Sequence, residues 1–158
     1  MCEWMVTNES PDGYALMHIS GETNDLHVGD IVALKPLGEY VETPTTWHVC
    51  LIRWAISENP EHIELGLELL APRAIAAEIA HPSTLAAGKI AALILPETPP
   101  LRPFESLVIP SGILKENTRK IILVVEDKNL EIREICATHL AEQTSAIEIF
   151  SVSPDYLP

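Results

Sequence analysis

The first residues of this sequence that could do chemistry are His48 and Cys50, two positions apart in one apolar stretch. Side chains at this spacing on a strand point to the same face. The imidazole and the thiol could therefore ligate one metal ion, or act as a base and a nucleophile. A structural zinc site needs four ligands, however, and no second pair at ligand spacing accompanies them. We interpret them as a buried cysteine beside a hydrogen-bonded histidine and predict no metal site.

Signatures of the common catalytic sites are also missing from the sequence. There is no GxGxxG, HExxH or paired CxxC, and Gly88-Lys89 is followed by Ile90 where a phosphate-binding loop has Ser or Thr. Glu64 and Glu68 alternate with apolar residues, so we interpret them as solvated charges on the outer face of a strand. We therefore predict that the protein is not an enzyme.

The segment from Asn8 to Gly13 predicts binding rather than catalysis. Asn8 and Ser10 provide short donors and acceptors, and Gly13 allows a tight turn or the close approach of a ligand. Arg53 alternates with an apolar row, so it is predicted to point outward, where it could stack on a base or pair with a phosphate. The alternative is a polar turn near a solvated arginine. Our candidate site is Asn8, Ser10, Gly13 and Arg53.

Composition limits the class of protein and its partners. The chain has 158 residues, 47% of them hydrophobic, which is enough for one ordinary domain or two small ones. Its formal net charge of −13 repels phosphate backbones, so we expect no DNA or RNA partner. Three widely spaced cysteines, no signal peptide and no apolar run of about 20 residues predict a cytoplasmic protein with no membrane contact.

The elements that must position these residues are predicted to be short strands separated by proline-containing loops. Alternation is clearest over 47–56 and 63–69, which we expect to pair antiparallel across a turn at 57–61. Five side chains of this pair are predicted to be buried: Ile52, Trp54, Ile63, Leu65 and Leu67. Further strands are expected over 14–19, 31–35, 90–95, 105–109, 119–125 and 146–152. Residues 130–142 fit either a helix or a strand, and we favour a strand because a β-branched run precedes them.

The order of these features resembles the PilZ domain, a small β-barrel that binds cyclic di-GMP in many bacterial signalling proteins. Asn8-Glu9-Ser10-Pro11-Asp12-Gly13 fits its [D/N]xSxxG motif. The Gly29-Asp30 strand start, the strand ending near Arg53 and the Leu/Glu strand around Gly66 follow in the family's order. The resemblance covers about residues 6–72. It implies cyclic di-GMP as the ligand and the motif loop as part of its site.

One motif of that family has no counterpart in this sequence. The resemblance implies an upstream RxxxR whose two arginines hold the guanines and phosphates, but no Arg or Lys precedes Asn8. We therefore expect weak or lost cyclic di-GMP binding, because charge-assisted contacts are the strong ones. The alternative function is an adaptor β-barrel that binds protein without a nucleotide.

The sequence as a whole predicts a mainly β protein. Residues 1–72 are expected to form a PilZ-like antiparallel β-barrel that lacks the family's first strand, and residues 73–158 a second, small barrel-like unit. An unpaired sheet edge and the apolar outer row of Trp47, Val49 and Leu51 lead us to expect a protein partner or a homodimer.

Overall fold

The computed structural model is all-β, as the sequence predicted. It describes residues 1–35, 47–59, 62–80, 89–114, 120–126 and 128–154, in which eleven strands and no helix are found. None of these residues belongs to a helix that could cross a membrane. The chain divides into two compact units, Met1–Pro72 and Arg73–Pro158.

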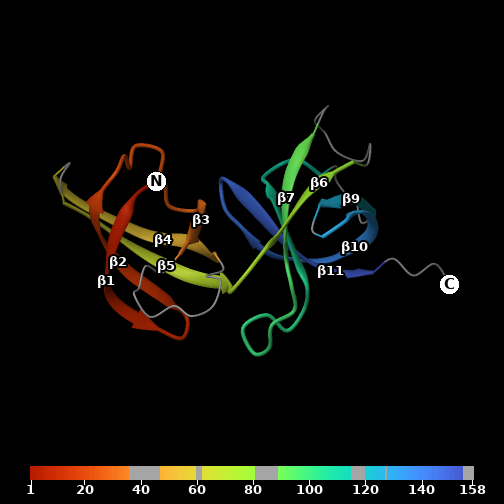
Figure 1. Cartoon of the computed structure of the whole chain (residues 1–158), viewed down its shortest axis with the longest axis horizontal. Coiled ribbons are helices and arrows are strands. Elements are labelled where there is room, and N and C mark those ends of the chain that lie inside the picture. Colours follow the sequence, from red (N-terminus) through yellow and green to blue (C-terminus); the bar gives the residue numbers. More distant parts are fainter. Residues whose placement is uncertain (36–46, 60–61, 81–88, 115–119, 127, 155–158) are drawn as a thin grey trace. The chain divides into compact units, whose positions relative to one another are not determined.

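The first unit is a curled, five-stranded antiparallel sheet with the order β1-β2-β5-β4-β3 (Figure 1). Its strands are β1 (Glu3–Ser10), β2 (Gly13–Ser20), β3 (Ile31–Leu34), β4 (His48–Asn59) and β5 (His62–Ala71). The hairpin β1–β2 closes at the pair Ser10 and Gly13, so Pro11 and Asp12 form its two-residue loop. The sequence predicted this turn but not the strand before it.

One face of this sheet carries the unit's apolar core. Leu16, Cys50, Ile52, Leu65 and Leu67 are buried there, with exposed fractions of 5% or less. Ile63 is partly buried against the same cluster. The predicted antiparallel pairing of the 47–56 and 63–69 segments is confirmed by the ladder between β4 and β5.

The predicted burial of Trp54 is wrong. The register of β4 against β5 shifts between Ile52, which faces Leu67, and Trp54, which faces Gly66. Arg53 is therefore an extra residue in a β-bulge, and such a residue reverses the alternation of faces beyond it. Trp54 lies on the face opposite Ile52 and remains 41% exposed.

Two other sequence expectations around β4 can be compared with the structure. Residues 57–59 continue the strand, so the predicted turn at 57–61 begins too early; residues 60 and 61 lie outside the described part. Val49 and Leu51, assigned to an outer row, are buried, whereas Trp47 is 43% exposed. The Lys35 ammonium lies 5.5 Å from the centre of the Trp47 ring, a cation–π distance.

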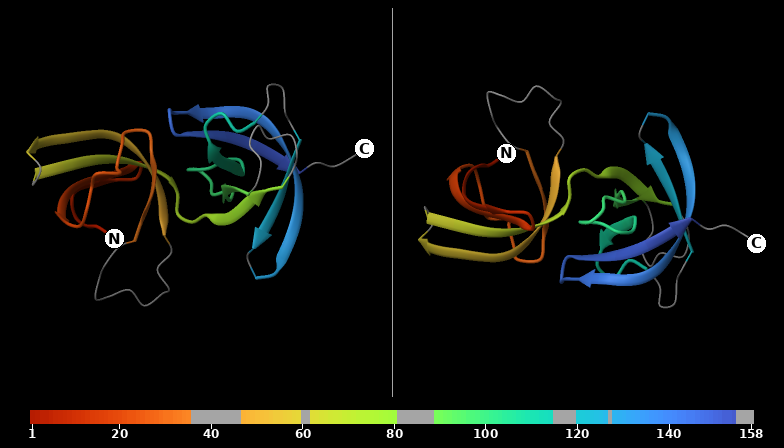
Figure 2. Two further views of the ribbon diagram at one scale, coloured as in Figure 1. Left: turned by 90° about the horizontal axis from the view of Figure 1, so that it is seen from above. Right: turned by 90° about the horizontal axis from the view of Figure 1, so that it is seen from below.

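The second unit is a closed antiparallel barrel with the strand order β10-β11-β8-β7-β6-β9 (Figures 1 and 2). Its strands are β6 (Ile75–Ile79), β7 (Ile90–Leu95), β8 (Ser106–Pro110), β9 (Lys120–Glu126), β10 (Leu130–Gln143) and β11 (Ile147–Pro154). The ladder between β9 and β10 closes it. Residues 130–142 thus lie in a strand, as the sequence favoured. Ile135 and Ala137, two positions apart, point into the barrel, whereas Ile132 is 71% exposed.

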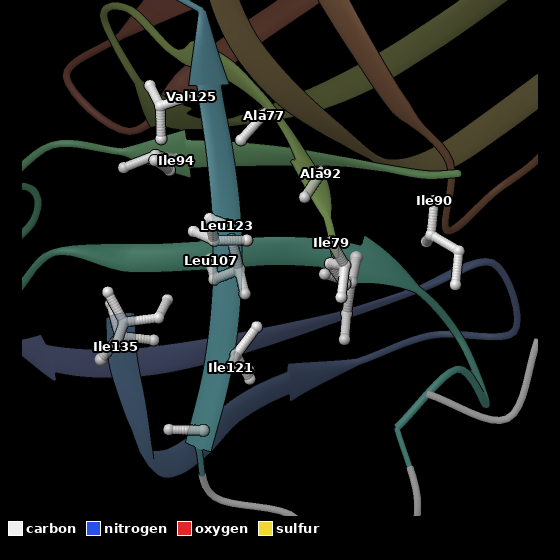
Figure 3. Close-up of a cluster of buried hydrophobic side chains, with 13 residues drawn as sticks. Ala77, Ile79, Ile90, Ala92, Ile94, Leu107, Ile121, Leu123, Val125 and Ile135 are labelled. Carbon is white, nitrogen blue, oxygen red and sulfur yellow. The ribbon is translucent and has the colours of Figure 1, made fainter. Parts of the chain in front are cut away.

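Aliphatic side chains from all six strands fill this barrel (Figure 3). Ile94, Leu107, Ile121 and Leu123 are among those with 1% exposure or less. The short strand β6, which is not among the strands expected from the sequence, contributes Ala77 and Ile79 to the core. The interior of a small barrel is filled by its own side chains, and these aliphatic residues form the core of the second unit.

Candidate ligand-binding cleft

A surface cleft of about 370 Å³ lies on the face of the first unit's sheet opposite its core. It extends over β1, β2, β5 and β4 and over the β1–β2 turn. The lining residues are Asn8, Glu9, Ser10, Asp12, Gly13, Tyr14, Ala15, Arg53, Trp54, Gly66, Leu67 and Glu68. All four residues of the sequence-predicted site, Asn8, Ser10, Gly13 and Arg53, are among them.

Strand register explains why these residues converge. Directly opposed residues of an antiparallel pair have side chains on the same face. One row across the sheet runs from Asn8 through Ala15 and Gly66 to Trp54, and the neighbouring row contains Ser10, Gly13 and Glu68. The polar residues of β1 thus form one rim of the cleft and β4 forms the other.

The floor between the two rims is low because its residues are small. At Gly13, a Cβ would overlap the backbone carbonyl of Leu67 and lie 3.2 Å from the Cα of Glu68. At Gly66, a Cβ would overlap the indole of Trp54. Glycine is therefore required at Gly13 by the close approach of β5, whereas Gly66 leaves room for the ring that lies over it.

The bulge in β4 supplies the rim opposite Asn8 and Ser10. Because Arg53 is the extra residue, both Arg53 and Trp54 are directed to the cleft, instead of one to each face. The Nε and a terminal nitrogen of Arg53 both contact one carboxylate oxygen of Glu68, on the neighbouring strand. Their side chains remain 40% and 39% exposed, so solvent reaches the ion pair.

The cleft is more acidic than basic. Glu9, Asp12 and Glu68 provide three carboxylates, and Arg53 is the one basic residue among the described lining residues. The unit around it has 12 acidic and two basic residues, a formal charge of −10 out of the chain's −13. An anionic ligand would therefore enter against the field of the unit.

The two candidates for metal or nucleophile chemistry do not form such a site. The Nδ1 of His48 lies within 3.2 Å of the Tyr14 hydroxyl, and burial raises the pKa of the Cys50 thiol to about 11. The thiolate is the nucleophilic and metal-binding form, so Cys50 is inert at neutral pH. No group of three or more His, Cys, Asp or Glu with metal-site geometry occurs among the described residues.

Tyr14 links this core pair to the cleft. Burial, then the charge of Glu9 and then Cys50 raise the pKa of its phenol above the usual value. Tyr14 is therefore neutral at neutral pH, and its ring, packed partly against the core cluster, supports the strand that carries Gly13 and Ala15.

Comparison with known families identifies this unit. Residues 1–75 match the family described as the middle PilZ domain of the cyclic-di-GMP receptor FimW. The first unit matches a PilZ domain over its whole length. No curated protein and no solved structure matches the chain.

In this unit the [D/N]xSxxG segment lies at the β1–β2 hairpin. Its residues Asn8, Ser10 and Gly13 all line the cleft. Sequence reasoning missed Trp54, which it assigned to the core, and Glu68, which it assigned to solvent. The glycine at position 66, between Glu64 and Glu68 on an outward row, is a sequence signal for something lying close to the backbone. No sequence signal marked the bulge.

Proposed function

We propose that the PilZ domain is a non-enzymatic receptor module and that cyclic di-GMP occupies the cleft between Asn8, Ser10 and Arg53. One observation carries this proposal. The residues of the [D/N]xSxxG segment meet Arg53 at one cleft, in a unit that matches the family of a cyclic-di-GMP receptor. The cleft volume, about 370 Å³, is in the range of small-molecule sites, which is roughly 300–1,000 Å³.

The chemistry of the two rims fits the parts of such a ligand. Asn8 and Ser10 provide amide and hydroxyl groups for the hydrogen-bonding edge of a guanine. The half-exposed indole of Trp54 provides a flat surface of the kind on which bases stack. The Arg53 guanidinium provides a charge-assisted donor for a phosphate.

We propose that the affinity of this chain for cyclic di-GMP is weak. A single arginine faces three carboxylates in the cleft, and residues 1–7 contain no Arg or Lys. Hydrogen bonds to charged groups contribute roughly 1.5–3 kcal/mol each, so a site with one guanidinium lacks much of the binding energy of a site with three.

The ligand acts as a switch by favouring one state of the domain over another, which changes how the module docks on a protein partner.

The test is a titration of the 158-residue chain with cyclic di-GMP, by calorimetry and by amide chemical shifts. We expect little heat, together with shifts at Asn8–Gly13 and at the indole of Trp54 at high ligand concentration. Ser10→Ala should weaken binding by about 0.5–1.5 kcal/mol, and Arg53→Ala by roughly 1.5–3 kcal/mol. Ser57→Ala is the matched control, because this serine is on β4 but outside the cleft.

Cyclic di-AMP tests whether the base edge is read. It has the same phosphates but a different hydrogen-bonding edge, so it should bind more weakly if Asn8 and Ser10 recognise guanine. Tight binding by this chain would show that residues other than arginines hold the phosphates. Absence of any shift at the cleft would contradict the receptor proposal.

A further inference from the structure

The ion pair between Arg53 and Glu68 lies inside the cleft and joins its basic group to one of its own carboxylates. Two nitrogens of the guanidinium contact the same oxygen of Glu68. The same guanidinium could donate to a phosphate oxygen instead, because carboxylates and phosphates both offer anionic oxygens as acceptors.

We propose that Glu68 sets the ligand affinity of the cleft by competing with a ligand phosphate for the Arg53 guanidinium. This inference rests on the proposed function, in that it assumes a ligand with an anionic phosphate. In the unliganded cleft the charge of Arg53 is then neutralised by Glu68, and a ligand phosphate reaches Arg53 only by displacing the Glu68 carboxylate.

The sheet register makes this competition a fixed property of the site. Glu68 is opposed to Leu51, and the extra residue Arg53 follows two positions later in the bulge. Arg53 therefore lies on the same face of β4 as Leu51, diagonally beside Glu68, and the bulge brings Trp54 to this face as well.

The exposure of the pair allows exchange. With 40% and 39% of their side chains exposed, both groups can rehydrate when they separate, and exposed pairs contribute little to stability. A phosphate can thus replace the carboxylate without leaving a buried, unpaired charge. The carboxylate remains in the cleft after displacement, so it opposes the ligand twice, by holding Arg53 and by repelling the phosphate.

Glu64 offers a matched control on the same strand. Glu64 precedes Glu68 by four residues on the same outward face of β5, and 37% of its side chain is exposed. Its carboxylate lies 3.6 Å from the imidazole of His62. It does not line the cleft. Glu64→Gln removes the same formal charge as Glu68→Gln, so it isolates the general electrostatic effect from competition for Arg53.

The experiment compares the wild-type chain with Glu68→Gln, Glu64→Gln and the double variant Arg53→Ala/Glu68→Gln. Each is titrated with cyclic di-GMP and separately with inorganic pyrophosphate, and the indole resonance of Trp54 reports occupancy of the cleft. We expect Glu68→Gln to bind both ligands about tenfold more tightly, which is about 1.4 kcal/mol. Glu64→Gln should change affinity less than about twofold, and the double variant should lose the gain.

The outcomes separate this inference from the proposed function. If cyclic di-GMP binds at the cleft but Glu68→Gln has no more effect than Glu64→Gln, competition by Glu68 is refuted and the receptor proposal stands. If Glu68→Gln strengthens pyrophosphate binding at the cleft while cyclic di-GMP does not bind, competition by Glu68 is supported and the nucleotide proposal fails. A gain that persists in the double variant would also overturn the inference, because it would not act through Arg53.

Discussion

Replacement of Gly13 by alanine tests the packing that forms the floor of the cleft. An added Cβ would overlap the carbonyl oxygen of Leu67 and lie 3.0 Å from its carbonyl carbon. The obstacle is backbone, so no side-chain rotation relieves it. Leu67 belongs to β5, which pairs with β2 on one side and β4 on the other, so a shift of this carbonyl disturbs two ladders.

The magnitude follows from two contributions. Overpacking typically costs about 1–3 kcal/mol, and displacement of the turn loses the 2.9 Å hydrogen bond from the Leu69 amide to the Asp12 carbonyl, about 1 kcal/mol. We therefore expect Gly13→Ala to destabilise the first unit by about 3 kcal/mol. Gly66→Ala is the contrasting variant, since its Cβ meets the half-exposed indole of Trp54, which can swing into solvent at about 1 kcal/mol or less.

Tryptophan fluorescence isolates the first unit in this assay, because Trp4, Trp47 and Trp54 all lie within residues 1–72. In urea, where small proteins have slopes of about 1–3 kcal/mol per molar, Gly13→Ala should lower the fluorescence midpoint by about 1–3 M. Gly66→Ala should lower it much less. Equal midpoints for the two variants would refute the argument that a backbone obstacle and a side-chain obstacle differ here.

Two further predictions concern the cores of the two units. Because burial raises the pKa of Cys50 to about 11, the unfolded chain loses this proton at lower pH than the folded chain, so stability falls as pH rises from about 9 towards 11, by roughly 1 kcal/mol per pH unit. Urea unfolding followed by fluorescence should give a lower free energy of unfolding at pH 10 than at pH 8, and Cys50→Ala should make this difference smaller. The same difference in the wild type and in Cys50→Ala would contradict the raised pKa of Cys50. Leu123→Ala in the barrel should cost about 2–5 kcal/mol, measured by far-ultraviolet circular dichroism, and a loss below about 1 kcal/mol would mean that the barrel core is poorly packed.

Features carried by local patterns could be predicted from the sequence. Alternation over β4 and β5 gave the pairing of these strands and the burial of Ile52, Leu65 and Leu67. The turn residues of the segment from Asn8 to Gly13 indicated where a polar rim would form, and the β-branched run before residue 126 favoured the strand β10 over a helix. In each case a few consecutive residues contain the physical cause.

Features that depend on how strands are registered could not be predicted in this way. The bulge at Arg53 arises from pairing with β5, so counting along β4 alone placed Trp54 on the wrong face. Strand β1 was missed because Glu3–Ser10 is mostly exposed and has no buried row to reveal its period. The ion pair of Arg53 with Glu68 joins residues 15 positions apart, and only the sheet brings them together.

The location of β1 has a consequence for how the cleft would report its ligand. Among the described strands, β1 pairs with β2 alone, so it is an edge strand. The amide protons of such a strand exchange through small local openings. Asn8 and Ser10 therefore belong to the part of the domain that opens most readily. Any molecule that bridges Asn8 and Ser10 to β4 raises the free energy of that opening. Slower deuterium uptake across Glu3–Ser10 would therefore reveal binding even where the heat of binding is too small to measure.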